Sequence, residues 1–518
     1  MSVSTPNSID KAAGHIEQVV PYDDKGIAGQ PRGLSTLFFT ELWERMSYYG
    51  MRAILILFMV APATSGGLGW SNGKAAGIYG LYTGAVYLLS LPGGWIADRF
   101  IGQWGAVLFG GIFIASGHFT LAFDRVNSFY IGLCLIVIGT GLLKPNISAM
   151  VGTLYASGDV RRDAGFSIFY MGINIGGTIA PFICGSLAQA DWFKDFLTSM
   201  GFNPLLSWHW GFAAAGVGML IGLTQYLLGR HRLADVRSVL SWSQSIKGLA
   251  AYLGIVSVIA AVLWLIETIW PVISAGSTTS KIVLTTLILS AILAAVIWLL
   301  KDLVAEERSR MIAIFIFVIF AALFWASFEQ AGSSLNLFAD QMTDSRIFGW
   351  SFPSSYFQAI GPISIILLAP VFAWIWIKLG NRQPSGPTKF SIGLLSAAVA
   401  FLLVALAAWF AGAGRAAPYW LVGVYTLLTI GELCLSPVGM STMTRLAPLR
   451  LVGLVMGIWF LALSMGNYMA GATAGFFDSS SRETVVNLFG GVGLAMLVSA
   501  LLLAVLTPTV RKLMRGAR

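Results

Sequence analysis

The sequence predicts an all-α integral membrane protein with fourteen transmembrane helices, arranged as two six-helix bundles with an inserted two-helix hairpin. Composition is the first reason: 57% of the 518 residues are hydrophobic and only 11% are charged, whereas soluble domains carry about 25% charged residues. The second is that apolar runs of about 20 residues, long enough to cross a bilayer, recur along the chain. The third is their grouping, because a basic loop at 230–247 and a charged stretch at 301–310 divide the runs into six, two and six.

The expected helices follow in order from the N-terminus. They lie at 34–61, 72–99, 103–122, 128–154, 164–190, 208–229, 246–272, 281–300, 309–337, 352–378, 388–412, 418–444, 451–477 and 485–508. The regions they define are an N-terminal tail at 1–33, a six-helix bundle at 34–229, a linker with the inserted pair at 230–308, a second six-helix bundle at 309–508 and a basic tail at 509–518. This layout is typical of a transporter whose site lies between two halves.

The distribution of Lys and Arg predicts the orientation. With the N-terminus in the cytoplasm, twenty-two of the 32 Lys and Arg residues fall on the inner side, seven on the outer side and three inside spans. The positive-inside rule therefore places both termini in the cytoplasm, and the even number of spans agrees. The first 33 residues lack the pattern of a cleavable signal, so the first span is expected to act as an uncleaved insertion signal.

Several classes of function are excluded by the same data. The net charge of +9 is scattered over short loops, which argues against a nucleic-acid partner. Cys134, Cys184 and Cys434 lie inside apolar runs, as small buried hydrophobic residues do. Neither GxxxxGK[ST] nor HExxH occurs, so we expect no ATP-driven step, no metal, no cofactor and no enzymatic activity.

The first span carries charges that a lipid-facing helix would not tolerate. It reads FFTELWERMSYYGMRAILILFM (38–59) and holds Glu41, Glu44, Arg45 and Arg52. Each would cost about 2.5–3.5 kcal/mol at the bilayer centre. At 100° per residue these charges and Tyr48 share an arc of roughly 100°, so this stripe faces a protein interior or a water-filled cavity. A structural ion-pair network that only fixes helix packing is the alternative.

Three later spans each carry an isolated charge: Lys144, Glu329 and Glu432. Pro145 and Pro437 follow two of them, and a proline removes a backbone donor, so we expect locally loosened helices there. With the first span, the interior holds three cations and four carboxylates. Such a set can bind both ends of a dipolar substrate and leaves carboxylates for proton transfer, although the lysine could instead only pair with one carboxylate.

Several motifs make the chain recognisable. ELWERMSYYG (41–50) and FYMGINIGGTIAP (169–181) resemble the two signatures of the bacterial proton-dependent oligopeptide transporter family of the major facilitator superfamily. GGWIADRFIG, GTGLLKPN, FWASFEQAGSS and GELCLSPVGMS are similar to further blocks of that family, in the expected order. The resemblance implies a major-facilitator-type fold and a proton-coupled symporter that imports di- and tripeptides by alternating access. It also implies a bacterial cytoplasmic membrane and a functional monomer.

The resemblance also implies roles for the charged residues. Glu41, Glu44 and Arg45 would form a proton-responsive cluster. Glu329, paired with Arg52 in one state, would report protonation to the gate. Protons, a peptide and the lipid bilayer are therefore the expected partners.

Substrate contacts are implied in the same way. Arg52 and Lys144 would attract the peptide carboxylate with help from Tyr49, and Glu432 and Asn174 would receive the amino group. The remaining residues implied to line the pocket are Tyr48, Tyr87, Trp325, Ser436 and Trp459. The sequence departs from the family where QAIGPIS (358–364) puts Gly361, in place of the usual Asn, before Pro362. One amine contact would then be missing, which leaves peptide-length preference open.

Three alternatives remain at this stage. A proton-coupled carrier of the same fold for another small solute, such as a drug, a sugar, nitrate or an amino-acid derivative, would not require the two charged ends of a peptide. An intramembrane enzyme would need a nucleophile–base or metal constellation. A passive channel is disfavoured by the two-half layout.

Overall fold

The computed structural model describes residues 23–156, 158–236, 242–274, 290, 300, 301, 303–412 and 414–514. The membrane-type helices of the first half are α1 Arg32–Val60, α2 Asn72–Leu88, α3 Ser90–Ile96, α4 Gln103–Leu121, α5 Val126–Thr153, α6 Arg162–Gln189 and α8 Ser207–Leu228. Those of the second half are α11 Ala305–Phe328, α12 Ser334–Gln341, α13 Ile360–Leu379, α14 Gly386–Phe410, α15 Pro418–Leu446, α16 Val452–Ala474 and α17 Arg482–Leu513. The other elements used below are α7 Asp191–Ser199, α9 Trp242–Ser274, β1 Arg346–Ile347, β2 Trp350–Ser351 and the short helical segments η3 Ala97–Ile101, η5 Gly229–Val236, η6 Glu329–Gly332 and η7 Ser354–Ala359.

Helices dominate because a chain in lipid must satisfy its backbone polar groups internally. Local signals set several helix ends. The Ser71 and Ser481 side chains accept bonds from backbone amides in the first turns of α2 and α17, which is N-capping. α14 and α15 begin with Pro387 and Pro418 in their first turns, where a missing backbone donor costs nothing. Eleven helical segments in the described ranges are long and apolar enough to cross a membrane.

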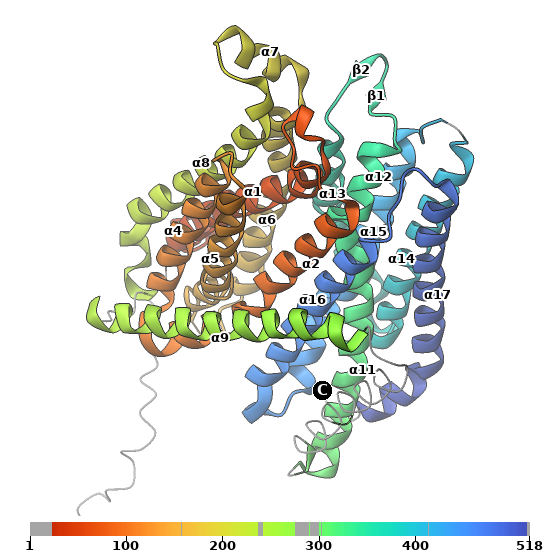
Figure 1. The fold of residues 1–518 in the computed structure, drawn as a ribbon. Coiled ribbons are helices and arrows are strands. Elements are labelled where there is room, and N and C mark those ends of the chain that lie inside the picture. Colours follow the sequence, from red (N-terminus) through yellow and green to blue (C-terminus); the bar gives the residue numbers. More distant parts are fainter. Residues whose placement is uncertain are drawn as a thin grey trace, which may run out of the picture.

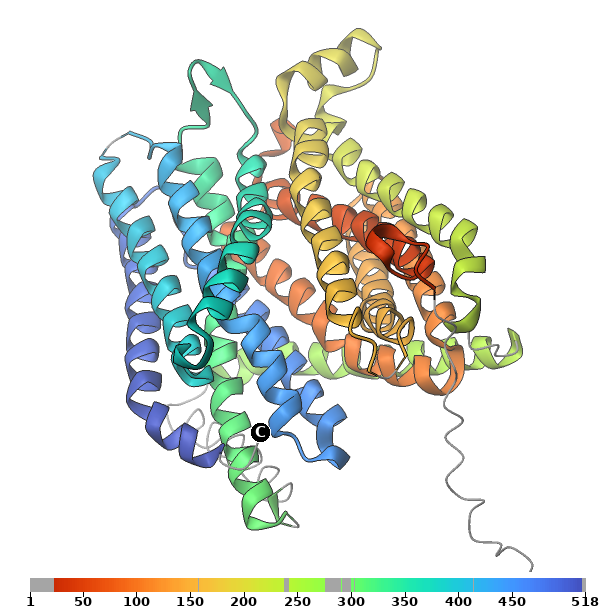
Figure 2. The same ribbon diagram turned by 180° about the vertical axis from the view of Figure 1, so that it is seen from behind.

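The helices form two halves that lie side by side (Figure 1). α1 to α8 occupy one half and α11 to α17 the other, and the view from behind shows the same division (Figure 2). We call the end where α1 begins and α17 ends the terminal side, and the opposite end the distal side. α7 and the β1–β2 hairpin project from the distal side. Two six-helix bundles are the architecture predicted from the spacing of apolar runs.

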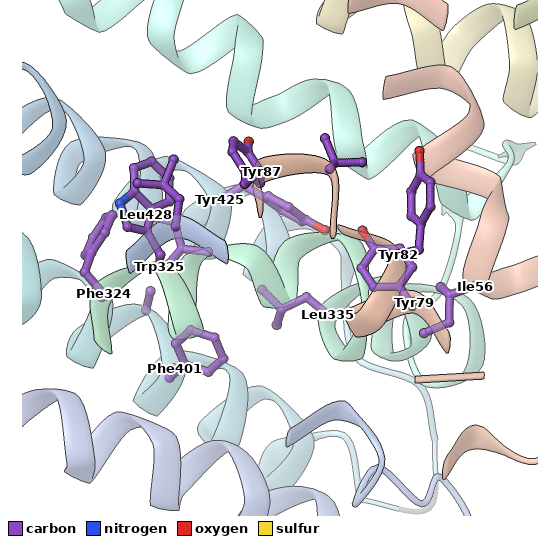
Figure 3. Packing of buried hydrophobic residues seen from close by; sticks show 14 of the residues in the cluster. Ile56, Tyr79, Tyr82, Tyr87, Phe324, Trp325, Leu335, Phe401, Tyr425 and Leu428 are labelled. Carbon is purple, nitrogen blue, oxygen red and sulfur yellow. The ribbon is translucent and has the colours of Figure 1, made fainter. Parts of the chain in front are cut away.

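The two halves touch each other on the distal side. α2 and α16 approach so closely that a Cβ added to Gly471 would lie 2.3 Å from the Gly80 Cα. The Asn72 amide donates a hydrogen bond of 3.0 Å to the Phe477 carbonyl near the same end. α6 also packs against η7 of the other half. A continuous apolar cluster joins the halves, with Tyr79 and Tyr87 from one and Trp325 and Tyr425 from the other (Figure 3).

α9 runs in a different direction from the bundle helices. It covers the expected span 246–272, and Ser243–Ala261 is long and apolar enough to cross a membrane. Both figures show α9 lying crosswise over the terminal part of the molecule. The Tyr252 hydroxyl holds it to α5 by donating to the Ile138 carbonyl at 3.1 Å. Hydropathy measures apolar length and not direction, so the sequence predicted a hairpin beside the other spans. Most of its second member, 281–300, lies outside the described residues.

The transmembrane helix that carries Glu329 is interrupted, at a position where the sequence has no proline. α5 stays helical through Pro145 and α15 through Pro437, so neither helix is interrupted at its proline, and the local loosening expected there stays a prediction. The Asn146 side-chain amide donates to the Leu142 carbonyl at 2.7 Å in the same turn as the proline. The interruption lies instead between α11 and α12, where η6 intervenes and Ser333 has non-helical φ and ψ of −122° and −97°.

Candidate functional site

A cavity of about 140 Å³ lies between the two halves, in the middle of the helices. The first half contributes Tyr49, Arg52, Tyr87, Tyr170, Ile173, Asn174 and Pro181 to its wall. The second half contributes Trp325, Phe328, Glu329, Ala331, Gln358, Gly361, Pro362, Ile365, Tyr425, Leu428, Thr429 and Glu432. The wall is therefore mostly apolar and aromatic, with a few charged groups, as small-molecule sites usually are.

One ion pair joins the halves across this cavity. Arg52 Nη2 lies 2.5 Å from Glu329 Oε2, and both side chains are more than 90% buried. The Nε atom of the same guanidinium donates to the Tyr79 hydroxyl at 2.6 Å. Because an arginine has a planar fork of donors, it holds both partners at once. Separation of the halves would leave two buried charges without their partners.

The break in the second half makes room for this pair. Glu329 begins η6, and Gly332 ends it. A Cβ on Gly332 would lie 1.9 Å from the Tyr79 hydroxyl oxygen and 2.6 Å from Arg52 Nε. Only glycine allows that approach, so the interrupted helix and the ion pair depend on each other.

A second cluster of charges lies two to three turns before Arg52 on α1. Arg45 Nε lies 3.3 Å from Glu41 Oε1, as the i,i+4 spacing predicts. The same guanidinium donates two hydrogen bonds to the Glu44 carboxylate. The Arg45 guanidinium carbon also lies 5.0 Å from the centre of the Tyr48 ring. Glu41 Oε2 is buried, and the described residues offer it no hydrogen-bond partner.

Lys144 packs against the face of an aromatic ring. In the described part of the chain, no carboxylate lies within salt-bridge distance of it. Its Nζ lies 3.9 Å from the centre of the Tyr87 ring, a cation–π contact. Tyr87 also lines the cavity. The cation therefore adjoins the cavity wall through this ring.

Glu432, on α15 of the second half, also lines the cavity. Its Oε2 atom is buried, and no donor among the described residues reaches it. A buried carboxylate oxygen without a donor is costly. The position is therefore one where a cationic group of a ligand would gain a strong interaction.

The comparisons with known proteins identify the family. The sequence model described as PTR2, POT family, matches residues 105–489 of this chain. The chain belongs to the POT family. The resemblance found in the motifs is thereby confirmed.

Relatives and solved structures of POT proteins match over nearly their full length. The peptide transporter YePEPT of Yersinia enterocolitica subsp. palearctica serotype O:3 (strain YE-P4) is 40% identical over 511 residues, covering 95% of this chain and 96% of that protein. The di-/tripeptide transporter of Lactococcus lactis subsp. cremoris is 35% identical over 508 residues, covering 96% and 99%. The crystal structure of a mutant of peptide transporter POT with alafosfalin superposes with a TM-score of 0.82 at 38% identity, covering 96% and 99%. The fold is thus the major-facilitator-type fold of POT transporters.

The structure brings together many, but not all, of the residues that the family motifs implied. The implied residues on the cavity wall are Arg52, Glu329, Glu432, Asn174, Tyr49, Tyr87 and Trp325. Lys144, Tyr48, Ser436 and Trp459 are not part of that wall. Trp459 is 2% exposed and packs so tightly on α15 that a Cβ on Gly439 would lie 2.2 Å from its ring. Its placement is that of a packing residue.

Sequence reasoning missed several polar groups of this POT site. Tyr79 bonds Arg52 directly, and its position eight residues before Tyr87, about 80° away on a helix, is the signal that points to it. The Gln358 amide donates to the Tyr425 hydroxyl at 2.9 Å, and both line the cavity. These two lie in apolar runs without a charged neighbour, so no pattern singled them out.

Metal ligation finds no support in the described ranges. No group of three or more His, Cys, Asp or Glu side chains there is arranged to hold a metal ion. The chemistry of the cavity is that of ion pairs, hydrogen bonds and aromatic contacts.

Proposed function

We propose that this chain is a proton-coupled symporter that imports di- and tripeptides by alternating access. The observation that carries the proposal is the Arg52–Glu329 pair, which joins the two halves in a cavity that also holds the unsatisfied Glu432 oxygen. The relatives named above as peptide and di-/tripeptide transporters support the substrate class. We place the protein in the cytoplasmic membrane of a bacterium, with both termini cytoplasmic, and infer a functional monomer.

A zwitterionic peptide matches the charges of the cavity. Its carboxylate needs a desolvated cation and its ammonium a desolvated anion. Arg52 lies on α1 of the first half and Glu432 on α15 of the second, so a bound peptide would bridge the halves. Lys144 would add positive charge on the carboxylate side, and Asn174 would assist at the amino group.

Protonation of Glu329 would couple the proton to the substrate. A neutral Glu329 no longer pairs with Arg52, which frees the guanidinium for the peptide carboxylate. Glu41 and Glu44, which surround Arg45, would form a second site where a proton can bind and be released. Movement of a proton inward down a membrane potential releases about 2.3 kcal/mol per 100 mV, which drives accumulation.

The two moving bodies would be the bundles at 34–229 and 309–508, with 230–308 as linker and 1–33 and 509–518 as tails. By the proposed orientation, the distal side faces outward. The Gly80–Gly471 contact closes that side, which supports an inward-facing state. The halves would rock about the cavity to open it to one side at a time.

The decisive experiment is uptake of labelled dialanine into liposomes that contain the purified chain, under an imposed inward proton gradient. We expect accumulation that a protonophore abolishes and that N- and C-blocked dialanine does not inhibit. Glu432→Gln should lower affinity for dialanine at least about tenfold, since a charged hydrogen bond is worth about 1.5–3 kcal/mol. Glu483→Gln in the first turn of α17 is the matched control and should behave as wild type.

Two outcomes would contradict this function. Absence of gradient-dependent uptake by a folded protein would favour a carrier of another solute. Equal inhibition by free and blocked dialanine would show that the charged ends are not recognised. Chemical cross-linking in the same liposomes tests the inferred monomeric state, which cross-linked dimers would contradict.

A further inference from the structure

A membrane-facing groove of about 460 Å³ lies along the terminal half of α8 and the start of η5. Its wall consists of Val217, Leu220, Ile221, Thr224, Gln225, Leu228, Gly229 and Arg232. Of these, Val217, Leu220, Ile221 and Leu228 are 42–72% exposed. Figures 1 and 2 both show α8 at the outer edge of its half. The groove is therefore large enough for a ligand and open to lipid.

The apolar part of the groove ends at a cluster of basic side chains. Arg232 closes the terminal end, and Arg230 and His231 precede it in η5, all three exposed. The Arg232 guanidinium donates to the Ser35 hydroxyl at 3.4 Å. Within the described ranges no carboxylate pairs with it. The cation is therefore oriented but not neutralised.

The groove also has a fixed polar floor. The Gln225 side chain accepts from the Thr40 hydroxyl at 3.0 Å and donates to the Thr36 carbonyl at 3.2 Å. These bonds tie α8 to α1 behind the groove. The floor is thus part of the bundle and does not depend on an occupant for its shape.

We propose that this groove binds one anionic phospholipid, with an acyl chain along α8 and the phosphate at Arg232. Charge complementarity decides between the possible occupants. The apolar part of the groove ends at Arg232, which pairs with no carboxylate among the described residues. The proposed orientation places this end of the groove at the cytoplasmic leaflet. Anionic lipids of that leaflet attract basic side chains, with about 1 kcal/mol for each Lys or Arg. A second copy of this chain could occupy the groove only if its surface placed an anion against Arg232 and an apolar ridge along α8.

The test is native mass spectrometry of the purified, delipidated full chain titrated with phosphatidylglycerol or with phosphatidylcholine of the same acyl chains. We expect wild type to bind one phosphatidylglycerol more tightly than phosphatidylcholine. Arg232→Gln should weaken phosphatidylglycerol about fivefold and phosphatidylcholine less, because the choline cation already offsets the charge of its phosphate. Ile221→Trp, which fills the apolar part, should weaken both lipids. The matched control is Arg382→Gln, which removes an exposed arginine at the terminal end of the other half and should change neither.

Four results would overturn the proposal. One is equal binding of the two lipids to wild type, and another is an equal effect of Arg382→Gln and Arg232→Gln. Displacement of phosphatidylglycerol by millimolar inorganic phosphate would show that only the phosphate is recognised and that the groove does not bind an acyl chain. Disulfide-linked dimers of Thr224→Cys in liposomes, in a Cys134→Ser background that removes the exposed native cysteine, would assign the groove to a second copy. Dialanine uptake under a proton gradient serves as a separate readout, so failure of the lipid site and failure of peptide transport are distinguishable.

Discussion

At the residue scale, two tyrosines on α2 provide a matched pair. Tyr79 accepts a hydrogen bond of 2.6 Å from Arg52, whereas the buried Tyr82 hydroxyl contacts no polar partner among the described residues. A hydrogen bond to a charged group contributes about 1.5–3 kcal/mol. We therefore expect Tyr79→Phe to lower proton-driven dialanine uptake at least about tenfold. Tyr82→Phe should retain wild-type uptake or stabilise the protein, because it removes an unsatisfied polar group.

The measurement is initial uptake rate against the size of the proton gradient, together with peptide affinity by competition. Tyr79 is not part of the cavity wall, so affinity should change less than the response to the gradient. Equal effects of the two substitutions would show that the Tyr79–Arg52 bond has no role in coupling.

Gly361 is the second residue where a substitution is informative. A Cβ there would meet only Thr429 Oγ1, at 3.9 Å, so the cavity has free space beside Gly361. Gly361→Asn should fill that space and lower uptake of trialanine relative to dialanine about tenfold, the typical cost of a small steric mismatch. Competition of both peptides against labelled dialanine measures the ratio. Gly361→Ala adds only a methyl group and should change it little; an unchanged ratio in Gly361→Asn would place the longer peptide elsewhere.

Much of the residue-level site could be predicted from the sequence, because charges are rare in membrane helices and costly outside a cavity. The stripe of Glu41, Arg45 and Arg52 on α1 is the clearest example. The Arg52–Glu329 contact required the family resemblance, since the two residues lie 277 positions apart. Tyr79 was missed although its helical spacing from Tyr87 points to it. Gln358 could not be found, because an uncharged polar residue in an apolar run is consistent with either face of a helix.

At the element scale, the contact between α2 and α16 controls closure of the distal side. Any side chain at Gly471 would collide with Gly80, and overpacking costs about 1–3 kcal/mol. We expect Gly471→Leu to shift the balance of states about 5–150-fold away from the distally closed one and to lower uptake accordingly. Gly453→Leu on the same helix is the control, because no atom lies within 4 Å of its Cβ position.

Uptake rates and the reactivity of a cysteine placed at Asn72 toward a membrane-impermeant reagent measure this shift. Increased reactivity with Gly471→Leu but not with Gly453→Leu is the expected result. Equal reactivity in the two variants would mean that the glycine contact does not close the distal side.

The loop between α5 and α6 anchors the start of α1. Arg161 donates to the Asp23 and Gly29 carbonyls at 3.0 and 3.1 Å, and Asp159 holds that guanidinium at 2.7 Å. The Arg161 side chain lowers the pKa of Asp159 below its ordinary value. A lowered pKa in the folded state means that the contribution is present above the unfolded pKa and is lost as pH falls through the folded one.

We therefore expect Asp159→Asn to increase amide hydrogen exchange of residues 23–31 at pH 7, compared with wild type at the same pH. As pH falls through the lowered pKa of Asp159 in the folded wild type, protonation of this carboxylate should make the two proteins alike. Asp191→Asn on the distal side is the control and should exchange as wild type across the same pH range. A difference between Asp159→Asn and wild type that does not diminish as pH falls would exclude the ion pair as the cause.

Helix positions could be predicted from the sequence because a bilayer fixes both the length and the apolar character of a span. α4 at Gln103–Leu121 agrees with the expected 103–122, and α8 at Ser207–Leu228 with 208–229. The break at η6 could not be predicted in this way, because it arises from the close packing of Gly332 against Arg52 and Tyr79 from the other half. The β1–β2 hairpin was missed because its two-residue strands are too short to show a period. α7 was missed although Phe193 and Leu197 recur at helical spacing, because only runs long enough to cross a bilayer were read as helices.

At the scale of the whole molecule, two bundles meet on the distal side and enclose a cavity with charges from both. Their arrangement could be predicted from the grouping of spans and the family motifs, and the structural likeness to POT transporters agrees. The direction of α9 could not, because it depends on tertiary contacts such as Tyr252 with Ile138. α9 is fixed to the first half by this contact, so it would move with that half during transport.

The three cations and four carboxylates inside the helical bundles have an electrical consequence. The cations are Arg45, Arg52 and Lys144, and the carboxylates are those of Glu41, Glu44, Glu329 and Glu432. With all groups ionised the centre carries one net negative charge, and a single bound proton makes it neutral. A zwitterionic peptide adds no net charge, so the loaded centre crosses the membrane field without electrostatic work and the empty, deprotonated centre returns as an anion. Each cycle would thus carry one positive charge inward, so transport would generate an electric current across the membrane. That current would reverse direction when the peptide and proton gradients together favour export.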